Sequence, residues 1–232
     1  ALAASAFLRI DGDGTITIWA NKSEMGQGIR TSMAMAIAEE LGADWSKIQV
    51  QQASTAAKFG DLGITGGSQS TRGTFKPYRL VGATAREMLI TAAAAKWSVD
   101  RTQCKAEMGF IVHGAHRAAF GELVEAASKL EAPTNPPLKD PKHFRILGTD
   151  VKRVDGPDIV TGRAQFGSDI KLPGMLYASV ERCPVFGGKL GSVDGSVAKT
   201  VPGVKRVITI SSGVAVLADS TWAALKGREA LK

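Results

Sequence analysis

Residues 24–42 read Glu-Met-Gly-Gln-Gly-Ile-Arg-Thr-Ser-Met-Ala-Met-Ala-Ile-Ala-Glu-Glu-Leu-Gly, and this stretch decides the fold of the amino-terminal part of the chain. Apolar residues recur at four-residue spacing from Met33 to Leu41, which predicts a helix over 29–41 with one buried stripe. Gly42 is a stop signal for that helix. Because a helix start carries unpaired N–H donors and partial positive charge, we expect the glycine loop before it to face an anion such as phosphate.

Short β-type runs flank this helix on both sides. Ala6–Ile10 and Thr15–Trp19 surround Asp11-Gly12-Asp13-Gly14, which is a strong hairpin turn signal. Ile48–Gln51 predicts a strand that returns to the same sheet. The order strand, loop, helix, strand is typical of a βαβ unit, in which the loop lies at a sheet edge where ligands commonly bind.

A second loop of glycine and hydroxyl residues, Thr65-Gly66-Gly67-Ser68-Gln69-Ser70, follows about forty positions later. We expect a long helix after it, from about Phe75 to Trp97, with Pro77 tolerated in its first turn. Backbone N–H groups of such a loop can form a nest for an anion, and Arg72 can add positive charge. The alternative is that the loop is a plain connector.

The pattern of predicted elements changes at a proline-rich segment. Before it, Phe110–Val112 predicts a strand and Phe120–Leu130 a second amphipathic helix. The segment 131–145 holds four prolines, which block helix and sheet, so it marks a domain boundary or a strap across the surface. Beyond it, β-type runs alternate with turns. The predicted elements there are strands at Met175–Arg182, Val204–Ile210 and Val214–Ala218, and a helix through Leu231 capped by Asp219, Ser220 or Thr221.

Composition limits the function classes. The chain has 232 residues, 44% of them hydrophobic and 22% charged, which is typical of a globular protein with one large domain or two modest ones. No apolar run approaches the roughly 20 residues that a bilayer span needs. The net charge of +7 comes from scattered basic residues, so we expect no nucleic-acid partner. An anionic cofactor or an acidic partner subunit explains the excess of positive charge equally well.

Metal chemistry from this chain alone is not indicated. Cys104 and Cys183 lie far apart, with no Cys-x-x-Cys pair, which excludes an iron–sulfur or structural zinc site of the usual ligand sets. We expect both thiols to be free and buried, with one disulfide as the alternative. His113 and His116 lie in a predicted hairpin turn without a third ligand nearby.

Three positions each have a functional and a structural interpretation. The amide of Gln27 can hydrogen-bond a polar heterocycle or phosphate, or it can simply be solvated. Glu24 is expected to be a favourable partner of the helix dipole rather than a catalytic group. The third glycine loop, 185–189, is expected to be a hairpin with a close backbone contact rather than a binding site.

These motifs resemble a known family. Residues 6–130 resemble the beginning of the molybdopterin-binding large subunit of isoquinoline 1-oxidoreductase-type enzymes, in the xanthine dehydrogenase and aldehyde oxidase superfamily. The matching stretches are Lys22-Ser23-Glu24-Met25-Gly26-Gln27-Gly28, Ala38-Glu39-Glu40-Leu41, Thr65-Gly66-Gly67-Ser68 with Ser70 and Arg72, and Phe120-Gly121-Glu122-Leu123.

Residues 146–232 resemble the α/β hammerhead domain of the same enzymes. The matching stretches are Val160-Thr161-Gly162, Leu172-Pro173-Gly174-Met175-Leu176-Tyr177-Ala178, Arg182-Cys183-Pro184 and Val201-Pro202-Gly203-Val204. The order of the two regions is the permuted one of the isoquinoline type. The resemblance therefore implies an α/β (α+β) fold: residues 1–130 are the first part of a molybdopterin-binding domain, 131–145 a linker, and 146–232 a truncated hammerhead domain.

The resemblance also implies a cofactor and its contacts. In that family the first loop contacts the pterin, and the second approaches the molybdenum and substrate end. The implied cofactor-binding residues are Met25, Gly26, Gln27, Gly28, Gly66, Gly67 and Ser68. The implied cofactor is molybdopterin in its cytosine dinucleotide form, with iron–sulfur clusters only on a small partner subunit.

The departures from the family pattern limit the activity. The catalytic glutamate of the family belongs to a segment far downstream, so we assign no catalytic residue and no metal ligand in this chain. Phe186-Gly187-Gly188-Lys189 imitates a family loop beside the metal, but its flanks match the hammerhead, and we do not assign it to the cofactor.

We expect an amino-terminal piece of a large subunit that is inactive alone. Its parent enzyme would oxidise an aldehyde or hydroxylate an N-heterocycle with oxygen from water. The competing hypotheses are a non-catalytic phosphate- or nucleotide-binding module and a subunit-interaction fragment. The periplasm, where many relatives are exported, and the cytoplasm both remain open as compartments.

Overall fold

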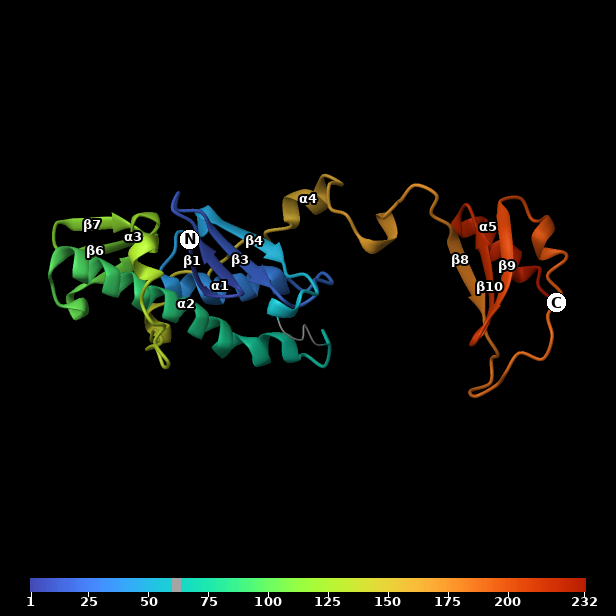
Figure 1. The fold of residues 1–232 in the computed structure, drawn as a ribbon, viewed down its shortest axis with the longest axis horizontal. Helices are drawn as coiled ribbons and strands as arrows, with labels where there is room; N and C mark the ends of the chain where they lie inside the picture. Colours follow the sequence, from blue (N-terminus) through green and yellow to red (C-terminus); the bar gives the residue numbers. More distant parts are fainter. Residues whose placement is uncertain (60–63) are drawn as a thin grey trace. The chain divides into compact units, whose positions relative to one another are not determined.

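The computed structural model describes residues 1–59 and 64–232, and the chain divides into two compact units, Ala1–Arg163 and Ala164–Lys232 (Figure 1). The proline-rich segment 131–145 therefore lies inside the first unit and not between the two units. Both units combine helices with small sheets, so the α/β (α+β) class is confirmed. No helix in the described part of the chain combines the length and apolar character that a membrane span requires.

The first unit is built on a four-stranded sheet of order β1-β2-β3-β4 and a smaller sheet of order β5-β6-β7. Its strands are β1 (Leu2–Ser5), β2 (Leu8–Ile10), β3 (Ile16–Ala20), β4 (Ile48–Gln52), β5 (Lys105–Glu107), β6 (Phe110–His113) and β7 (His116–Ala119). Its helices are α1 (Ile29–Leu41), α2 (Gln69–Trp97), α3 (Phe120–Ala127) and the short α4 (Gly156–Val160).

The predicted hairpin and βαβ unit are both present. β2 and β3 pair antiparallel with Ile10 opposite Ile16, and the N–H of Asp11 donates to the carbonyl oxygen of Thr15 at 2.9 Å across the turn. β3 and β4 pair in parallel with Ile16 beside Ile48. Helix α1 forms the crossover between these parallel strands, as such a connection requires.

Helix α1 has the bounds that its apolar spacing predicts, and Met33, Ile37 and Leu41 are at most 3% exposed. Gly42 ends it in a left-handed conformation, φ 73°. A Cβ at this glycine would also lie 2.8 Å from the carbonyl oxygen of Ala106. The glycine is therefore needed both for its φ value and for close packing against β5.

Helix α2 starts earlier than its sequence predicts. It begins at Gln69 rather than Phe75, so Pro77 lies in its interior instead of its first turn. Thr71 and Phe75 of the early turns lie close to Ser32 of α1, although most residues from Gln69 to Pro77 are exposed. The first buried residue of α2 is Tyr78, directly after the proline. Local sequence signals therefore do not show that the helix extends to the residues before Pro77.

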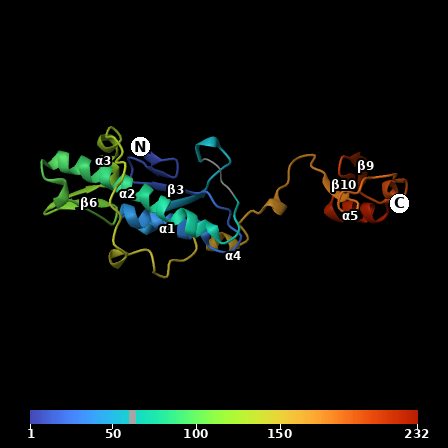
Figure 2. The same ribbon diagram turned by 90° about the horizontal axis from the view of Figure 1, so that it is seen from below.

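Helices α1 and α2 lie side by side on one face of the sheet and run in the same direction (Figure 2). Their beginnings meet at Ser32 and Thr71, and Glu40 near the end of α1 pairs with Arg86 further along α2. A Cβ at Gly82 would lie 2.3 Å from the carbonyl oxygen of Ile37, so the two backbones approach closely there. Both helices consequently begin at the carboxyl end of the parallel strands β3 and β4.

The second unit is a three-stranded antiparallel sheet of order β8-β10-β9 with one helix against it. Its elements are β8 (Tyr177–Glu181), β9 (Val204–Ile210), β10 (Gly213–Ala218) and α5 (Thr221–Glu229). Ser220 caps α5 by accepting a hydrogen bond from the N–H of Ala223 at 3.2 Å. Of the three predicted capping candidates, Ser220 is therefore the cap.

Two predictions about the second unit are wrong. Residues 185–189 do not form a hairpin between strands, because β8 ends at Glu181 and the next strand, β9, begins at Val204. The close backbone contact is real, since a Cβ at Gly188 would lie 2.1 Å from Sγ of Cys183. Both cysteines are free, but only Cys104 is buried, while Cys183 is exposed.

Candidate functional site

The structure joins the first glycine loop (residues 24–28) to the second glycine loop (residues 65–68). The backbone N–H of Ser23 donates to Oγ1 of Thr65 at 3.0 Å, across 42 positions of sequence. The first loop follows the carboxyl end of β3 and leads into α1, and the second loop leads into α2. The predicted site residues therefore gather at the sheet edge where ligands of α/β proteins commonly bind.

The start of α1 is not an open anion site, and that expectation is wrong. Oε1 of Glu24 accepts the N–H groups of Gly26 at 2.9 Å and Gly28 at 2.8 Å, and Oε2 accepts that of Arg30 at 3.2 Å. The carboxylate thus occupies the positive end of the helix that we expected a bound anion to fill. The prediction that Glu24 is a dipole partner agrees with these bonds.

The electrostatics of Glu24 follow from this geometry. Burial alone would raise its pKa, but the N–H groups of Gly28, Arg30 and Gly26 and the charge of Arg153 together lower that pKa below the ordinary value. The side chain is therefore ionised at neutral pH. It neutralises the helix start from inside the loop.

Gln27 braces the first loop with its side chain. Its Oε1 accepts the N–H of Met25 at 2.6 Å, and its Nε2 donates to the carbonyl oxygen of Ser23 at 3.0 Å. The amide is therefore not simply solvated, and it keeps one N–H and one lone pair for other partners.

The surface of the first loop is open. Met25 is 69% exposed, and Gly26 and Gly28 have φ values of 100° and 81°. A Cβ at either glycine would meet nothing within 4 Å. Glycine is required here for its left-handed conformation, and the space above both residues is free for a ligand.

The second loop leads into the start of α2. Gly67 and Ser68 have φ values of 60° and 55°, and the N–H of Gln69 donates to the carbonyl oxygen of Gly66 at 3.2 Å. The side chain of Ser68 makes no capping bond to α2, and the first turn of the helix holds no acidic residue. Within residues 1–59 and 64–232, the start of α2 therefore offers backbone N–H donors to an anion.

Tyr78 connects α2 to the strand end from which the first loop departs. Its hydroxyl lies 3.2 Å from the carbonyl oxygen of Trp19 and 3.1 Å from Oδ1 of Asn21, and its single proton serves these two acceptors. Burial raises the pKa of Tyr78 above its ordinary value. The neutral phenol therefore fixes the position of α2 relative to the carboxyl end of β3.

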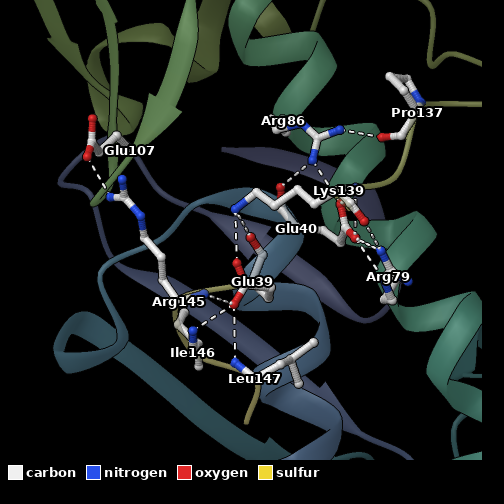
Figure 3. A network of polar contacts seen from close by, with 10 residues as sticks. All are labelled: Glu39, Glu40, Arg79, Arg86, Glu107, Pro137, Lys139, Arg145, Ile146 and Leu147. Atoms are coloured by element: carbon white, nitrogen blue, oxygen red, sulfur yellow. Dashed lines mark hydrogen bonds and ion pairs between the residues drawn. The ribbon is translucent and has the colours of Figure 1, made fainter. Parts of the chain in front are cut away.

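At the other end of α1, two adjacent buried carboxylates form a network that sequence reasoning did not identify as such (Figure 3). Glu40 pairs with Arg79 at 2.6 Å and Arg86 at 2.8 Å, and it accepts the N–H of Lys139 at 3.0 Å. Arg86 also donates to the carbonyl oxygen of Pro137. The proline-rich segment is thereby attached to both helices as a strap, one of the two alternatives that its composition left open.

Glu39 extends this attachment to the residues that follow. Its Oε2 accepts three consecutive backbone N–H groups, from Arg145 at 2.8 Å, Ile146 at 2.6 Å and Leu147 at 3.1 Å. Burial would raise the pKa of Glu39, but these bonds and the charge of Lys139 lower it on balance below 4.5. The signal in the sequence was Glu40, which lies seven positions after Met33 and therefore near the face of α1 that was expected to be apolar.

A cavity of about 1070 Å³ lies beside this network, at the end of α1 opposite the glycine loops. Trp45, Cys104 and Phe144 contribute to its apolar lining. Glu39, in its wall, already accepts the backbone N–H of Ile146. We place the candidate site at the loops because both glycine motifs and the starts of both long helices lie there.

The histidines do not form a metal site. The rings of His113 and His116 stack with centroids 6.0 Å apart, and Trp97 stacks on His116 at 5.4 Å. Among the residues that the structure describes, no group of three or more His, Cys, Asp or Glu side chains is arranged to hold a metal ion.

Residues 1–166, which contain both loops and the attached strap, match the family model of the molybdopterin cofactor-binding domain. The chain belongs to this family. The resemblance of the sequence motifs to the molybdopterin-binding large subunits is therefore confirmed, and the match covers the whole first unit.

Relatives of this molybdopterin-binding family member are much longer than the chain. Isoquinoline 1-oxidoreductase subunit beta from Brevundimonas diminuta is 33% identical over 272 aligned residues, covering 100% of this chain and 35% of the relative. A membrane-bound aldehyde dehydrogenase [pyrroloquinoline-quinone] from Gluconacetobacter polyoxogenes is 34% identical, covering 95% and 30%. The chain thus spans about a third of the length of these curated relatives.

One solved structure is also similar to this family member. Quinoline 2-oxidoreductase from Pseudomonas putida 86 is 24% identical in sequence, with a TM-score of 0.43. The similarity covers 51% of this chain and 15% of that one.

Proposed function

We propose that this chain is part of the large subunit of a molybdenum hydroxylase, and that its two glycine loops form one wall of the molybdopterin site. The observation that carries the proposal is the hydrogen bond from Ser23 to Thr65. It joins both loops at one sheet edge within the stretch that matches the molybdopterin-binding family.

The residues present fit such a cofactor, which carries phosphate. The second loop would lie at the molybdenum and substrate end of the cofactor, where Gly66, Gly67 and Ser68 present the start of α2 and Arg72 adds charge. When bound, the cofactor supplies two-electron redox chemistry at molybdenum. The role of the second loop is to bind and orient it.

The first loop would approach the pterin through Met25, Gly26, Gln27 and Gly28. The bonds of the Gln27 side chain to Ser23 and Met25 hold the backbone of this loop in place for the contact. The open space above Gly26 and Gly28 admits a flat ring system. In this proposal, the cofactor is the cytosine dinucleotide form of molybdopterin.

The whole enzyme would oxidise an aldehyde or hydroxylate an N-heterocycle, adding oxygen from water. The names of the two curated relatives, an isoquinoline oxidoreductase and an aldehyde dehydrogenase, support these two substrate classes. Electrons would pass to a small iron–sulfur subunit, and the general base would come from the remainder of the large subunit. Within this scheme, 1–130 is the first part of the cofactor domain and 131–145 its strap. Of the stretch 146–232 that resembles the hammerhead, the compact unit Ala164–Lys232 would be that domain, and 146–163 would belong to the cofactor domain.

Cofactor content tests the proposal. The full-length large subunit is purified with its partner, and molybdenum, pterin and pyrroloquinoline quinone are measured for the wild type, Gly67→Val and Gly114→Val. Both glycines have positive φ and no crowded Cβ position, but Gly114 lies in the β6–β7 turn. We expect stoichiometric pterin in the wild type and Gly114→Val, and loss of it in Gly67→Val. Equal pterin in all three, or quinone in place of pterin, would contradict the proposal.

A further inference from the structure

Arg153 contacts the first loop from 127 positions away in the sequence. Its Nη1 donates to the carbonyl oxygen of Gly26 at 2.8 Å, and its Nη2 lies 3.4 Å from Oε1 of Glu24. One guanidinium thus binds both a backbone oxygen of the loop and the carboxylate that occupies the start of α1. Nothing in the sequence motifs singled out this arginine.

The guanidinium is held in place from behind. Asp155 accepts two hydrogen bonds from it, Nε to Oδ1 at 2.9 Å and Nη2 to Oδ2 at 2.8 Å. The backbone is fixed too, because the N–H of Val154 donates to Oγ1 of Thr31 in the first turn of α1 at 3.1 Å. A bidentate pair of this kind orients the arginine as well as binding it.

The bond to Gly26 determines where the next N–H points. The carbonyl of Gly26 and the N–H of Gln27 belong to one planar trans peptide, so they point in opposite directions. With the carbonyl fixed toward Arg153, the N–H of Gln27 points away from it. Within residues 1–59 and 64–232, this N–H has no acceptor.

Such an orientation needs a restraint. Gly26 has φ 100° and no Cβ, and a peptide next to a glycine can rotate at little steric cost. The hydrogen bond from Arg153 favours one of the two orientations. Without that bond, the peptide could rotate, and the carbonyl oxygen of Gly26 would then take the place of the N–H of Gln27. An acceptor atom of a ligand on that side would face the carbonyl oxygen instead of a donor.

We infer that Arg153 is a positioning residue, which holds the Gly26–Gln27 peptide so that the N–H of Gln27 is presented to an acceptor atom of the cofactor. The inference rests on the proposed function, in which the first loop contacts the pterin. It adds a residue that acts through the loop without touching the cofactor itself.

The test uses the full-length large subunit with its partner subunit, in the wild type, Arg153→Ala, Arg153→Lys and Arg163→Ala. Arg163 is the matched control, because it forms an exposed ion pair with Asp158 at 3.0 Å. Two quantities are measured: the rate of pterin release, and amide hydrogen exchange in residues 24–30 compared with β3. Neither depends on turnover.

We expect Arg153→Ala to release pterin about ten- to a hundredfold faster, the effect of one charge-assisted hydrogen bond. Its amide exchange should rise in residues 24–30 and not in β3. Arg153→Lys keeps one donor but loses the bidentate pair, so it should lie between wild type and Arg153→Ala. Arg163→Ala should match the wild type.

Equal release from Arg153→Ala and Arg163→Ala, or unchanged exchange in residues 24–30, would overturn the inference. If Arg153→Ala does not fold, Arg153→Lys decides by the same two measurements. A wild type without pterin would refute the proposed function, and the exchange of the loop amides would then decide the role of Arg153 by itself.

Discussion

The carboxylate of Glu39, near the end of α1, accepts a hydrogen bond from the backbone N–H of Ile146 at 2.6 Å, across 107 positions of sequence. Together with the bonds from Arg145 and Leu147, it fixes the end of the strap to the helix that follows the first loop. The strap continues to Arg153, which binds that loop at the other end of α1. One segment therefore connects both ends of this helix.

Glu39 makes the stability of the first unit depend on acid pH. Because its pKa in the folded protein lies below 4.5, its contribution is fully present above that value and is lost as the pH falls through the folded pKa. We expect the free energy of unfolding to decrease in this window for the wild type. Glu39→Gln should be less stable at neutral pH and should show a shallower decrease. Urea unfolding followed by tryptophan fluorescence measures both, and equal slopes below pH 4.5 would refute the role of Glu39.

Glu40→Ala should be among the most damaging substitutions in the first unit. Glu40 is fully buried, and its removal leaves Arg79 and Arg86, whose side chains are 11% and 10% exposed, without their shared partner. Loss of one member of a buried ion pair costs about 3–5 kcal/mol. Glu125→Ala, which breaks an exposed pair with Lys129, should cost less than about 1 kcal/mol. Similar unfolding free energies for the two variants would argue against the network.

Two glycines of α2 should respond in opposite directions to alanine. A Cβ at Gly82 would lie 2.3 Å from the carbonyl oxygen of Ile37, so Gly82→Ala must push α1 and α2 apart, at a cost of about 1–3 kcal/mol. A Cβ at Gly73 meets nothing within 4 Å, so Gly73→Ala should stabilise the helix by up to about 1 kcal/mol. Thermal unfolding of both variants checks this, and a neutral Gly82→Ala would disprove the close contact.

Tyr78→Phe should loosen the connection between α2 and the end of β3. The variant leaves the half-buried acceptors Trp19 and Asn21 without the hydroxyl proton, which costs about 0.5–1.5 kcal/mol. We expect lower stability and faster amide exchange in residues 21–28. Tyr177→Phe, in the second unit, is the control and should leave that exchange unchanged. If the two variants show the same stability and the same amide exchange, Tyr78 does not connect α2 to the end of β3.

Much of the local structure follows from the sequence because its determinants are local. Helix α1 has the predicted bounds, since the spacing of Met33, Ile37 and Leu41 and the stop at Gly42 act within a few residues. The turn at 11–14 and the parallel pairing of β3 with β4 are likewise encoded by turn residues and element order. The family was also recognisable, because its loop motifs are short and contiguous.

The rest depends on contacts between distant residues. Glu24 can accept the N–H groups at the start of α1 only in the observed conformation of the first loop. The hydrogen bonds of the Gln27 side chain stabilise that conformation. Pro77 lies inside α2, because the helix includes exposed turns before the proline that no local sequence signal marks. The attachment of Lys139 to Glu40 spans 99 positions, and no periodic pattern marks it. These features decide which of the two helix starts can receive an anion.

The most direct measurement is an experimental structure of the cofactor-loaded full-length protein, with anomalous scattering from molybdenum to locate the metal. The account predicts cofactor atoms within hydrogen-bond distance, about 2.7–3.2 Å, of the N–H of Gln27 and of backbone N–H groups between Gly66 and Gln69. A cofactor bound away from both loops, for example in the cavity beside Glu39, would contradict it.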